Sequence, residues 1–218
     1  MKKSNLAKAV VYGFLLLMTM TSCKNIAKFM NNVVEHNYVE NGVKLAYEGE
    51  TVLDVPYTDT ELYIDSDVAK ISLQGGPDAP LRLKLCYQEY KPRDATFMIE
   101  NRKITYYTKS GKPASLKEVI GNVPNSLALN IDVGTGNVEV QKMKDSPKIS
   151  VNCGTASVDI QNCSLDMLEA NTGTGNINVT SCTINTATLE TGTGNINLKS
   201  TQIEKRNFST GTGGVNEE

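Results

Sequence analysis

The feature that most constrains this chain is a short motif that recurs at nearly constant spacing through its C-terminal half. Gly-Thr-Gly-Asn and its degenerate forms begin at glycines spaced 20, 19, 19 and 19 residues apart. The five copies occupy residues 134–137, 154–157, 173–176, 192–195 and 211–214. Five copies in register favour a repeat architecture over a globular fold with coincidental glycine turns.

Apolar residues fall in columns when the copies are aligned on the leading glycine. The column three positions before the glycine holds Ile131, Val151, Ala170, Leu189 and Phe208; the column four after holds Val138, Val158, Ile177, Ile196 and Val215. Further columns hold Val140, Ile160, Val179 and Leu198, then Met143, Cys163, Cys182 and Thr201, then Leu165, Ile184 and Ile203. Polar residues alternate with the first columns, and this period of two predicts strands with one buried face.

A repeat of 19 residues cannot bury its apolar face alone, so the copies must stack in parallel, about 4.8 Å apart. The sequence therefore predicts an all-β, right-handed, single-stranded β-helix or β-solenoid. About five rungs, each with about three short strands, would fill residues 131–218. Glycine at a corner permits positive φ, and Asn tolerates it. We expect Asn137, Asn176 and Asn195 to form a ladder of side-chain amide hydrogen bonds.

Residues 43–130 lack this period but contain alternating apolar runs separated by turn signals, among them Leu81-Leu83-Leu85 and Gly75-Gly76-Pro77. We interpret them as longer, irregular rungs that also cap the stack, because an open rung would expose unpaired backbone groups. No composition typical of a linker divides the halves. The prediction is one β-solenoid domain over residues 43–218.

The N-terminus reads as a targeting segment. Lysines precede an apolar run, Ala9 to Met20, that is too short for a membrane-spanning helix, and Met20-Thr21-Ser22-Cys23 resembles a lipobox. We expect residues 1–22 to be a lipoprotein signal peptide and Cys23 to carry acyl chains such as palmitate. Two or more chains give stable anchoring. The alternative is an ordinary secretory signal with an incidental cysteine. Residues 23–42 would be a tether.

Charge and composition exclude several kinds of site. The formal net charge is -2, and no basic block indicates a nucleic-acid partner. His36, the only histidine, rules out a histidine cluster in catalysis or metal binding. We predict no catalytic residue, no metal and no cofactor. The partners would be the membrane, through the lipid anchor, and a glycan or protein.

The remaining cysteines and carboxylates have structural interpretations. Cys163 and Cys182 share a column at a spacing that a disulfide allows, but a ladder of buried free thiols is favoured and the pairing stays open. Glu139 and Asp159 share an outward column, as paired acids of β-helix lyases and glycosidases do. The column continues with Asn178, Asn197 and Asn216 and has no basic residue, so a solvated face is favoured.

Aromatic residues gather in the front half, at Tyr87, Tyr90, Tyr106 and Tyr107. Their alternation places about half of them inside. Tyr90, Lys91, Arg93 and Tyr107 are the predicted ligand-contact residues.

The leader, the irregular β front and the step from Val123-Pro124 into Leu127–Ile131 precede the Gly-Thr-Gly-Asn rungs. Together these features resemble the candidate-adhesin family of Bacteroidota lipoproteins, which includes head GIN β-helix domains and related domains of unknown function. The likeness covers roughly residues 50–218.

The resemblance implies an envelope-anchored surface or periplasmic protein and supplies no catalytic residues. We expect a non-enzymatic binding protein. We expect the outer membrane, with its side open, because Lys24-Asn25 lacks the aspartate that retains lipoproteins at the inner membrane. We expect a monomer, because the acids Glu217 and Glu218 would blunt an open edge. Alternatives are a β-helix glycan-processing enzyme, either lyase or glycosidase, and a periplasmic scaffold or signalling protein.

Overall fold

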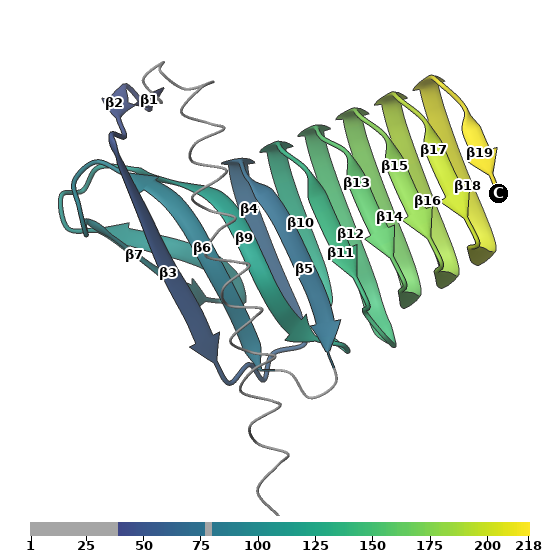
Figure 1. Ribbon diagram of the computed structural model, residues 1–218, viewed down its shortest axis with the longest axis horizontal. Coiled ribbons are helices and arrows are strands. Elements are labelled where there is room, and N and C mark those ends of the chain that lie inside the picture. The colour runs from purple at the N-terminus through teal and green to yellow at the C-terminus, as the bar shows by residue number, and fades with distance from the viewer. Residues whose placement is uncertain (1–38, 77–79) are drawn as a thin grey trace, which may run out of the picture.

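The computed structural model describes residues 39–76 and 80–218, and every regular element in them is a β-strand (Figure 1). An eight-stranded and a nine-stranded sheet form the body, and a short hairpin of β1 (Val39–Glu40) and β2 (Val43–Lys44) precedes them. The predicted signal peptide, Cys23, His36 and the tether up to residue 38 lie outside the described residues. The all-β prediction is confirmed.

The C-terminal half is a stack of parallel rungs, each with a long strand in one sheet and a short strand in the other (Figure 1). The long strands are β10 (Ala128–Thr135), β12 (Ser146–Thr155), β14 (Ser164–Thr174), β16 (Thr183–Thr193) and β18 (Gln202–Thr212). The short strands are β11 (Val138–Gln141), β13 (Val158–Gln161), β15 (Ile177–Thr180), β17 (Ile196–Lys199) and β19 (Val215–Glu217). The predicted solenoid is confirmed. Its rungs have two strands rather than three, because the third run continues into the long strand.

The predicted apolar columns lie inside the stack. Their members are buried through β17, and in the last rung Val215 is 43% exposed. Two further inward columns were not predicted from the sequence. One holds Leu129, Ile149, Leu168 and Ala187, and the other holds Val133, Cys153, Thr172 and Thr191. The two threonines are buried because their hydroxyls donate to the carbonyl oxygens of Ala156 and Gly175, each at 2.9 Å.

The two glycines of the motif have different roles. The second glycine has positive φ, 148° at Gly175 and 147° at Gly194, as a tight corner requires. The first glycine stacks on its counterpart: a Cβ on Gly173 would lie 2.7 Å from the carbonyl oxygen of Gly154. The first position therefore excludes a side chain by contact, and Gly175 and Gly194 exclude one by contact and by backbone conformation. The second copy has Ala156 at the second position, where the backbone does not adopt a positive φ.

The predicted ladder of corner asparagines has different partners from those expected. The Asn176 side-chain oxygen accepts from the backbone N–H of Asn195 at 2.8 Å, and Asn195 accepts from Gly214 at 3.0 Å. The prediction of amide-to-amide bonds between these side chains is wrong, because each amide oxygen faces a backbone donor in the next rung.

One additional rung precedes the motif. The strands β4 (Glu61–Val68) and β5 (Lys70–Gly76) pair in parallel with β10 and β11, with Ile64 beside Ile131 and Leu73 beside Val140. Its corner contains Ala69, whose N–H donates to the carbonyl oxygen of Thr135 at 3.1 Å. The prediction of rungs before residue 131 holds for this segment.

The rest of the front half is an antiparallel cap, not a set of irregular rungs. It contains β3 (Tyr47–Val55), β6 (Leu81–Glu89), β7 (Ala95–Glu100), β8 (Lys103–Thr108) and β9 (Ala114–Pro124). The β9 strand makes the transition, since it pairs in parallel with β5 and antiparallel with β6. This part of the sequence-based interpretation is wrong, because alternation alone does not distinguish parallel from antiparallel neighbours. One core cluster runs from Leu62 in the first rung through the cap to Ile203 in the last rung.

An ion pair lies across the open C-terminal end of this core. Arg206 is in register with buried Ala187, and Glu217 is in register with buried Leu198, so both occupy inward positions of the last rung. The Nη1 of Arg206 lies 2.9 Å from both carboxylate oxygens of Glu217. Inward-pointing charges are one way in which proteins blunt an open edge.

Candidate functional site

The predicted contact residues lie on two adjacent turns of the cap. Tyr90, Lys91 and Arg93 belong to the turn between β6 and β7, and Tyr107 precedes the turn between β8 and β9. We call residues 90–94 and 107–113 the cap tip. Lys91 Nζ lies 5.5 Å from the centre of the Tyr90 ring, within the range of a cation–π contact.

A buried carboxylate holds the first turn. Glu89 is 2% exposed, and its two oxygens accept from the backbone N–H groups of Arg93 at 2.7 Å and of Asp94 and Ala95 at 2.9 Å. Three charge-assisted hydrogen bonds fix the path of the chain, including Arg93 at a φ of 60°. The turn therefore presents Tyr90 and Lys91 from a rigid base.

A second buried carboxylate ties the two turns together. Asp94 is 4% exposed and accepts from the N–H and the hydroxyl of Ser110, at 2.9 Å and 2.5 Å. Lys109 N–H donates to the carbonyl oxygen of Asp94, and Lys109 Nζ donates to that of Arg93 at 2.9 Å. The sequence did not predict Glu89, Asp94, Lys109 or Lys112 as part of this site. These residues belong to the site because the two turns lie against each other, and no pattern in the sequence predicts that contact.

Of the four tyrosines only Tyr87 is buried, so the prediction that about half of them lie inside is wrong. The Tyr87 ring centre lies 4.6 Å from that of Phe97, and Tyr106 lies 5.3 Å from the same ring but is 38% exposed. Tyr107, next in the strand, faces away and is 52% exposed. The tip thus presents Tyr107, Lys91, Arg93, Lys109 and Lys112 to solvent, all of them exposed.

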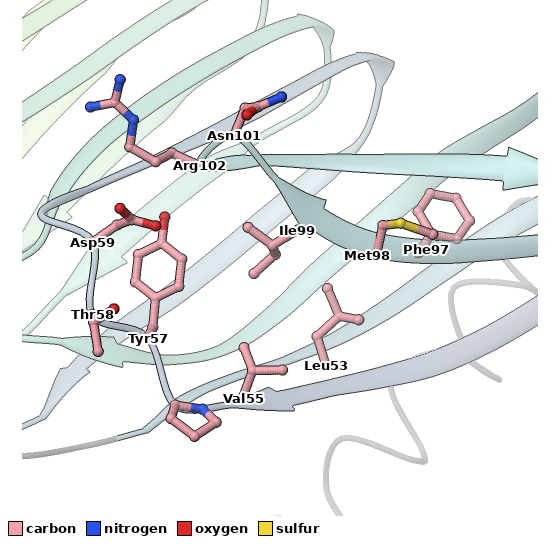
Figure 2. A pocket seen from close by; sticks show the side chains of 11 residues that line it. Leu53, Val55, Tyr57, Thr58, Asp59, Phe97, Met98, Ile99, Asn101 and Arg102 are labelled. Atoms are coloured by element: carbon pink, nitrogen blue, oxygen red, sulfur yellow. The ribbon is translucent and has the colours of Figure 1, made fainter.

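A pocket lies at the opposite end of the cap strands. Its volume is about 670 Å³, and it is bounded by the end of β3, the segment that follows it, and β7 with its turn (Figure 2). Leu53, Val55, Phe97 and Ile99 give it an apolar floor, while Tyr57, Asp59 and Asn101 add polar groups. Polar and apolar groups contribute about equally to its lining, so it can contact both apolar faces and hydroxyls of a ligand.

Tyr57 is fixed at the edge of this pocket. Its hydroxyl donates to the carbonyl oxygen of Glu61 at 2.5 Å. Burial, reinforced by the nearby Asp59 carboxylate, raises the pKa of Tyr57 to about 12. The group therefore stays neutral and serves as a hydrogen-bonding and stacking surface rather than as an acid or base.

The β7–β8 turn on the pocket rim has two residues in the left-handed region, Asn101 at a φ of 50° and Arg102 at 66°. Arg102 holds this conformation with two contacts: its carbonyl oxygen accepts from Tyr63 N–H at 2.8 Å, and its Nη1 lies 3.0 Å from Glu61 Oε2. Both residues line the pocket, and Figure 2 shows their side chains on its rim, turned away from the apolar floor.

The outward carboxylates of the solenoid are engaged by their neighbours. Asp159 accepts from the Asn178 amide at 2.8 Å, and the same bond repeats from Asn197 to Asn178 and from Asn216 to Asn197. Glu139 accepts from the Ser72 hydroxyl at 3.3 Å. This column is an amide ladder along one face of the sheet, the solvated structural role that the sequence favoured.

The buried cysteines are free thiols. Cys163 and Cys182 are not bonded to each other, and the backbone N–H of Cys163 donates to the Cys182 sulfur at 3.4 Å. They stack with Met143 in the core, as the ladder interpretation predicted. Burial raises the pKa of the neighbouring core thiol, Cys153, to about 11, so this thiol stays protonated at neutral pH.

Within residues 39–76 and 80–218, no group of three or more His, Cys, Asp or Glu side chains is arranged to hold a metal ion. The same part of the chain contains no helix with the length and hydropathy of a membrane span.

A family model described as Toastrack DUF4097 matches residues 47–217. The chain belongs to this family. The match covers the cap and every rung of this Toastrack domain, and it agrees with the family resemblance drawn from the sequence. None of the curated proteins compared with the chain matches it.

Several solved structures are similar to this Toastrack domain. A candidate cell adhesion protein from Clostridium sporogenes is 14% identical, with a TM-score of 0.40, over 78% of this chain and 99% of that one. A candidate adhesin from Parabacteroides distasonis is 14% identical, with a TM-score of 0.40, over 79% and 97%. Another from Parabacteroides merdae is 15% identical, with a TM-score of 0.33, over 82% and 97%.

Proposed function

We propose that this protein is a lipid-anchored binding protein of the cell envelope, of the adhesin type and without catalytic activity. Cys23 is its lipid attachment site, and the outer membrane is its location. The cap, rather than the solenoid, makes its contacts. The observation that carries this proposal is that two buried carboxylates, Glu89 and Asp94, fix the turns that present exposed tyrosine, lysine and arginine.

The pocket at the other end of the cap is the proposed site for a glycan or protein partner. The Tyr57 ring, the Asp59 carboxylate and the Asn101 amide border one hollow of mixed polar and apolar lining. Sugars present apolar faces and planar arrays of hydroxyls, which suit an aromatic ring beside carboxylate and amide groups. A glycan is therefore the partner that this pocket fits best.

The contacts of the outward column argue against the glycan-processing alternative. A glycosidase needs one carboxyl group that donates a proton and a second that acts on the sugar or on water. Glu139 and Asp159 are engaged in the rung-to-rung ladder instead. The proposal thus keeps the protein as a binder.

Two measurements test the proposal. Metabolic labelling with an alkyne fatty acid should label the wild-type protein and not Cys23→Ser. A glycan array with the mature chain should give hits that Asp59→Ala or Asn101→Ala lowers about tenfold, since each change removes a polar contact to the bound sugar. Asp166→Ala on the solenoid is the matched control and should retain binding. Turnover of any bound glycan would contradict the non-catalytic assignment.

A further inference from the structure

The N-terminal segment joins the cap at the same end as the cap tip, which carries exposed basic residues. Tyr47, the first residue of β3, pairs with Glu89, the last residue of β6, so the chain enters the cap beside the tip. Val39 follows Cys23 by 16 positions. A chain of that length spans at most about 55 Å when fully extended. A lipid on Cys23 would therefore attach at the tip end of the cap, within this length of the membrane surface.

The charges of the tip are almost all positive on its outer surface. Lys91, Arg93, Lys109 and Lys112 are exposed, whereas Glu89 and Asp94 point inward and are satisfied by backbone and hydroxyl donors. The neighbouring β3 adds one exposed carboxylate, Glu48, opposite Gln88; the next, Glu50, is paired with Lys84 at 3.0 Å. The surface therefore complements an anionic partner.

Exposed tyrosines flank these charges. Tyr107 is 52% exposed and Tyr47 is 46% exposed. Tyrosine combines an apolar ring with a polar tip and is enriched where protein meets the boundary between lipid and water. Basic residues interleaved with such rings are typical of surfaces that bind anionic headgroups.

The solenoid presents corners with few charges on the same side. In the register, β9 begins at the tip and its Glu118 lies beside Lys70, which follows the Ala69 corner. That corner is bonded to the corner at Thr135, and the later corners stack upon it. All five copies of the corner tetrapeptide lack charged residues, and the corner of the first rung carries one exposed carboxylate, Asp67, with Lys70 three positions on. This side therefore has a single carboxylate and no row of them.

We propose that the cap tip docks on the anionic headgroups of the membrane in which the protein is anchored. This orientation rests on the proposed lipid anchor. It lays the solenoid along the membrane, because the rungs stack across the direction of the cap strands (Figure 1). The nine residues of β3 then hold the pocket of Tyr57 and Asp59 about 30 Å from the lipid, open to a partner.

The test uses the mature chain with Cys23→Ser, so that no acyl chain contributes, and vesicles of phosphatidylethanolamine with phosphatidylglycerol. The chain should sediment with these vesicles, should fail to sediment with phosphatidylcholine alone, and should dissociate at high salt. Each basic residue near an anionic surface contributes roughly fivefold in affinity. Lys91→Gln with Lys112→Gln should therefore weaken binding roughly 25-fold.

The matched control is Lys144→Gln with Lys205→Gln, which removes the same charge from exposed positions of the solenoid and should leave binding unchanged. Unaltered thermal unfolding will show that both variants are folded. An equal loss of binding to the anionic vesicles in the tip variant and the solenoid variant would overturn the docking proposal. Equal binding of the unsubstituted tip to anionic vesicles and to phosphatidylcholine vesicles would overturn it as well. So would binding to an acidic polysaccharide without binding to vesicles. Failure of the proposed anchor is scored separately, by fatty-acid labelling of the wild-type protein at Cys23.

Discussion

The cap and the solenoid bury different kinds of polar group. In the described residues, the buried ionisable side chains other than tyrosine and cysteine are Glu89, Asp94, Lys117 and Glu118, all in the cap. The buried polar residues of the solenoid are Ser146, Thr172 and Thr191, whose hydroxyls bond to nearby carbonyl oxygens. Burying charge is costly unless it is well partnered, so repetition alone does not account for it. The fold of the cap therefore depends on specific partners for buried charges, whereas that of the solenoid depends on the repeat.

Glycine substitution should show the largest difference between the two regions. A Cβ at Gly175 in the solenoid would lie 1.8 Å from the carbonyl oxygen of Ala156, at a φ that only glycine readily adopts. Gly175→Ala should lower the free energy of unfolding by about 3 kcal/mol or more. At Gly111 in the cap tip the space is open and only the positive φ opposes a side chain, so Gly111→Ala should cost about 1 kcal/mol.

Urea denaturation measures both values. Equal midpoints for the two variants would mean that the stacked glycine corners are no more restrictive than a solvent-exposed turn.

The buried carboxylate of the tip should give the next largest effect. Glu89→Gln keeps the shape but replaces one acceptor oxygen with a donor, opposite backbone N–H groups. We expect a loss of about 2 kcal/mol. Hydrogen exchange should accelerate at the amides of Arg93, Asp94 and Ala95, which the carboxylate holds. Glu48→Gln, on the exposed part of β3, is the control and should change neither quantity; unchanged exchange in Glu89→Gln would remove the basis for a rigid tip.

The free energy of unfolding should depend on alkaline pH through Lys117, a buried lysine of the cap. Burial, partly offset by Glu40 and Asp67, lowers the pKa of Lys117 to about 8. The unfolded chain, with an ordinary lysine pKa of about 10.4, binds more protons between these values. The contribution of Lys117 to stability should therefore rise from pH 8 to about pH 10, by about 1 kcal/mol once solvent screening is discounted. Cys153, whose pKa is raised to about 11, acts in the opposite direction from about pH 9, and Tyr57, whose pKa is raised to about 12, does so above about pH 10.

The measurement is the unfolding free energy of wild type and Lys117→Met across this range. The variant should lose the rise, while Lys144→Met on the solenoid should retain it. A rise of the same size in Lys117→Met would show that another group is responsible.

The smallest effect on stability is expected at the open end of the solenoid. Arg206 and Glu217 are partly exposed, so Arg206→Ala should cost less than about 1 kcal/mol. Arg206→Leu with Glu217→Val, however, continues two apolar columns to the end of the stack and should promote end-to-end association. Light scattering should show a mass that rises with concentration in this double variant and a monomer in the wild type. A wild-type mass that rises in the same way would show that the ion pair does not block stacking.

The sequence predicted the structure of the solenoid much more completely than that of the cap. The solenoid follows from the glycine spacing, because a strict repeat places every column above itself. The column containing Cys153 and Thr172 was missed, since threonine and cysteine do not stand out as core residues. The irregular β front was predicted, but its strands were interpreted as rungs because alternation does not reveal strand direction. Tyr90, Lys91, Arg93 and Tyr107 stay a prediction made from composition. Glu89 and Asp94 were not predicted, since their roles depend on a pairing of turns.

The most direct test of the claim that the cap makes the contacts is photo-crosslinking in living cells. A diazirine side chain would replace Tyr107 in the tip or Glu190 on the exposed face of the solenoid, in the wild-type and Cys23→Ser backgrounds. We expect crosslinks to membrane lipid from position 107 and few from position 190, with those from 107 lost when Cys23 is replaced. Crosslinks of equal yield from the two positions, or only from position 190, would contradict the division of roles between cap and solenoid.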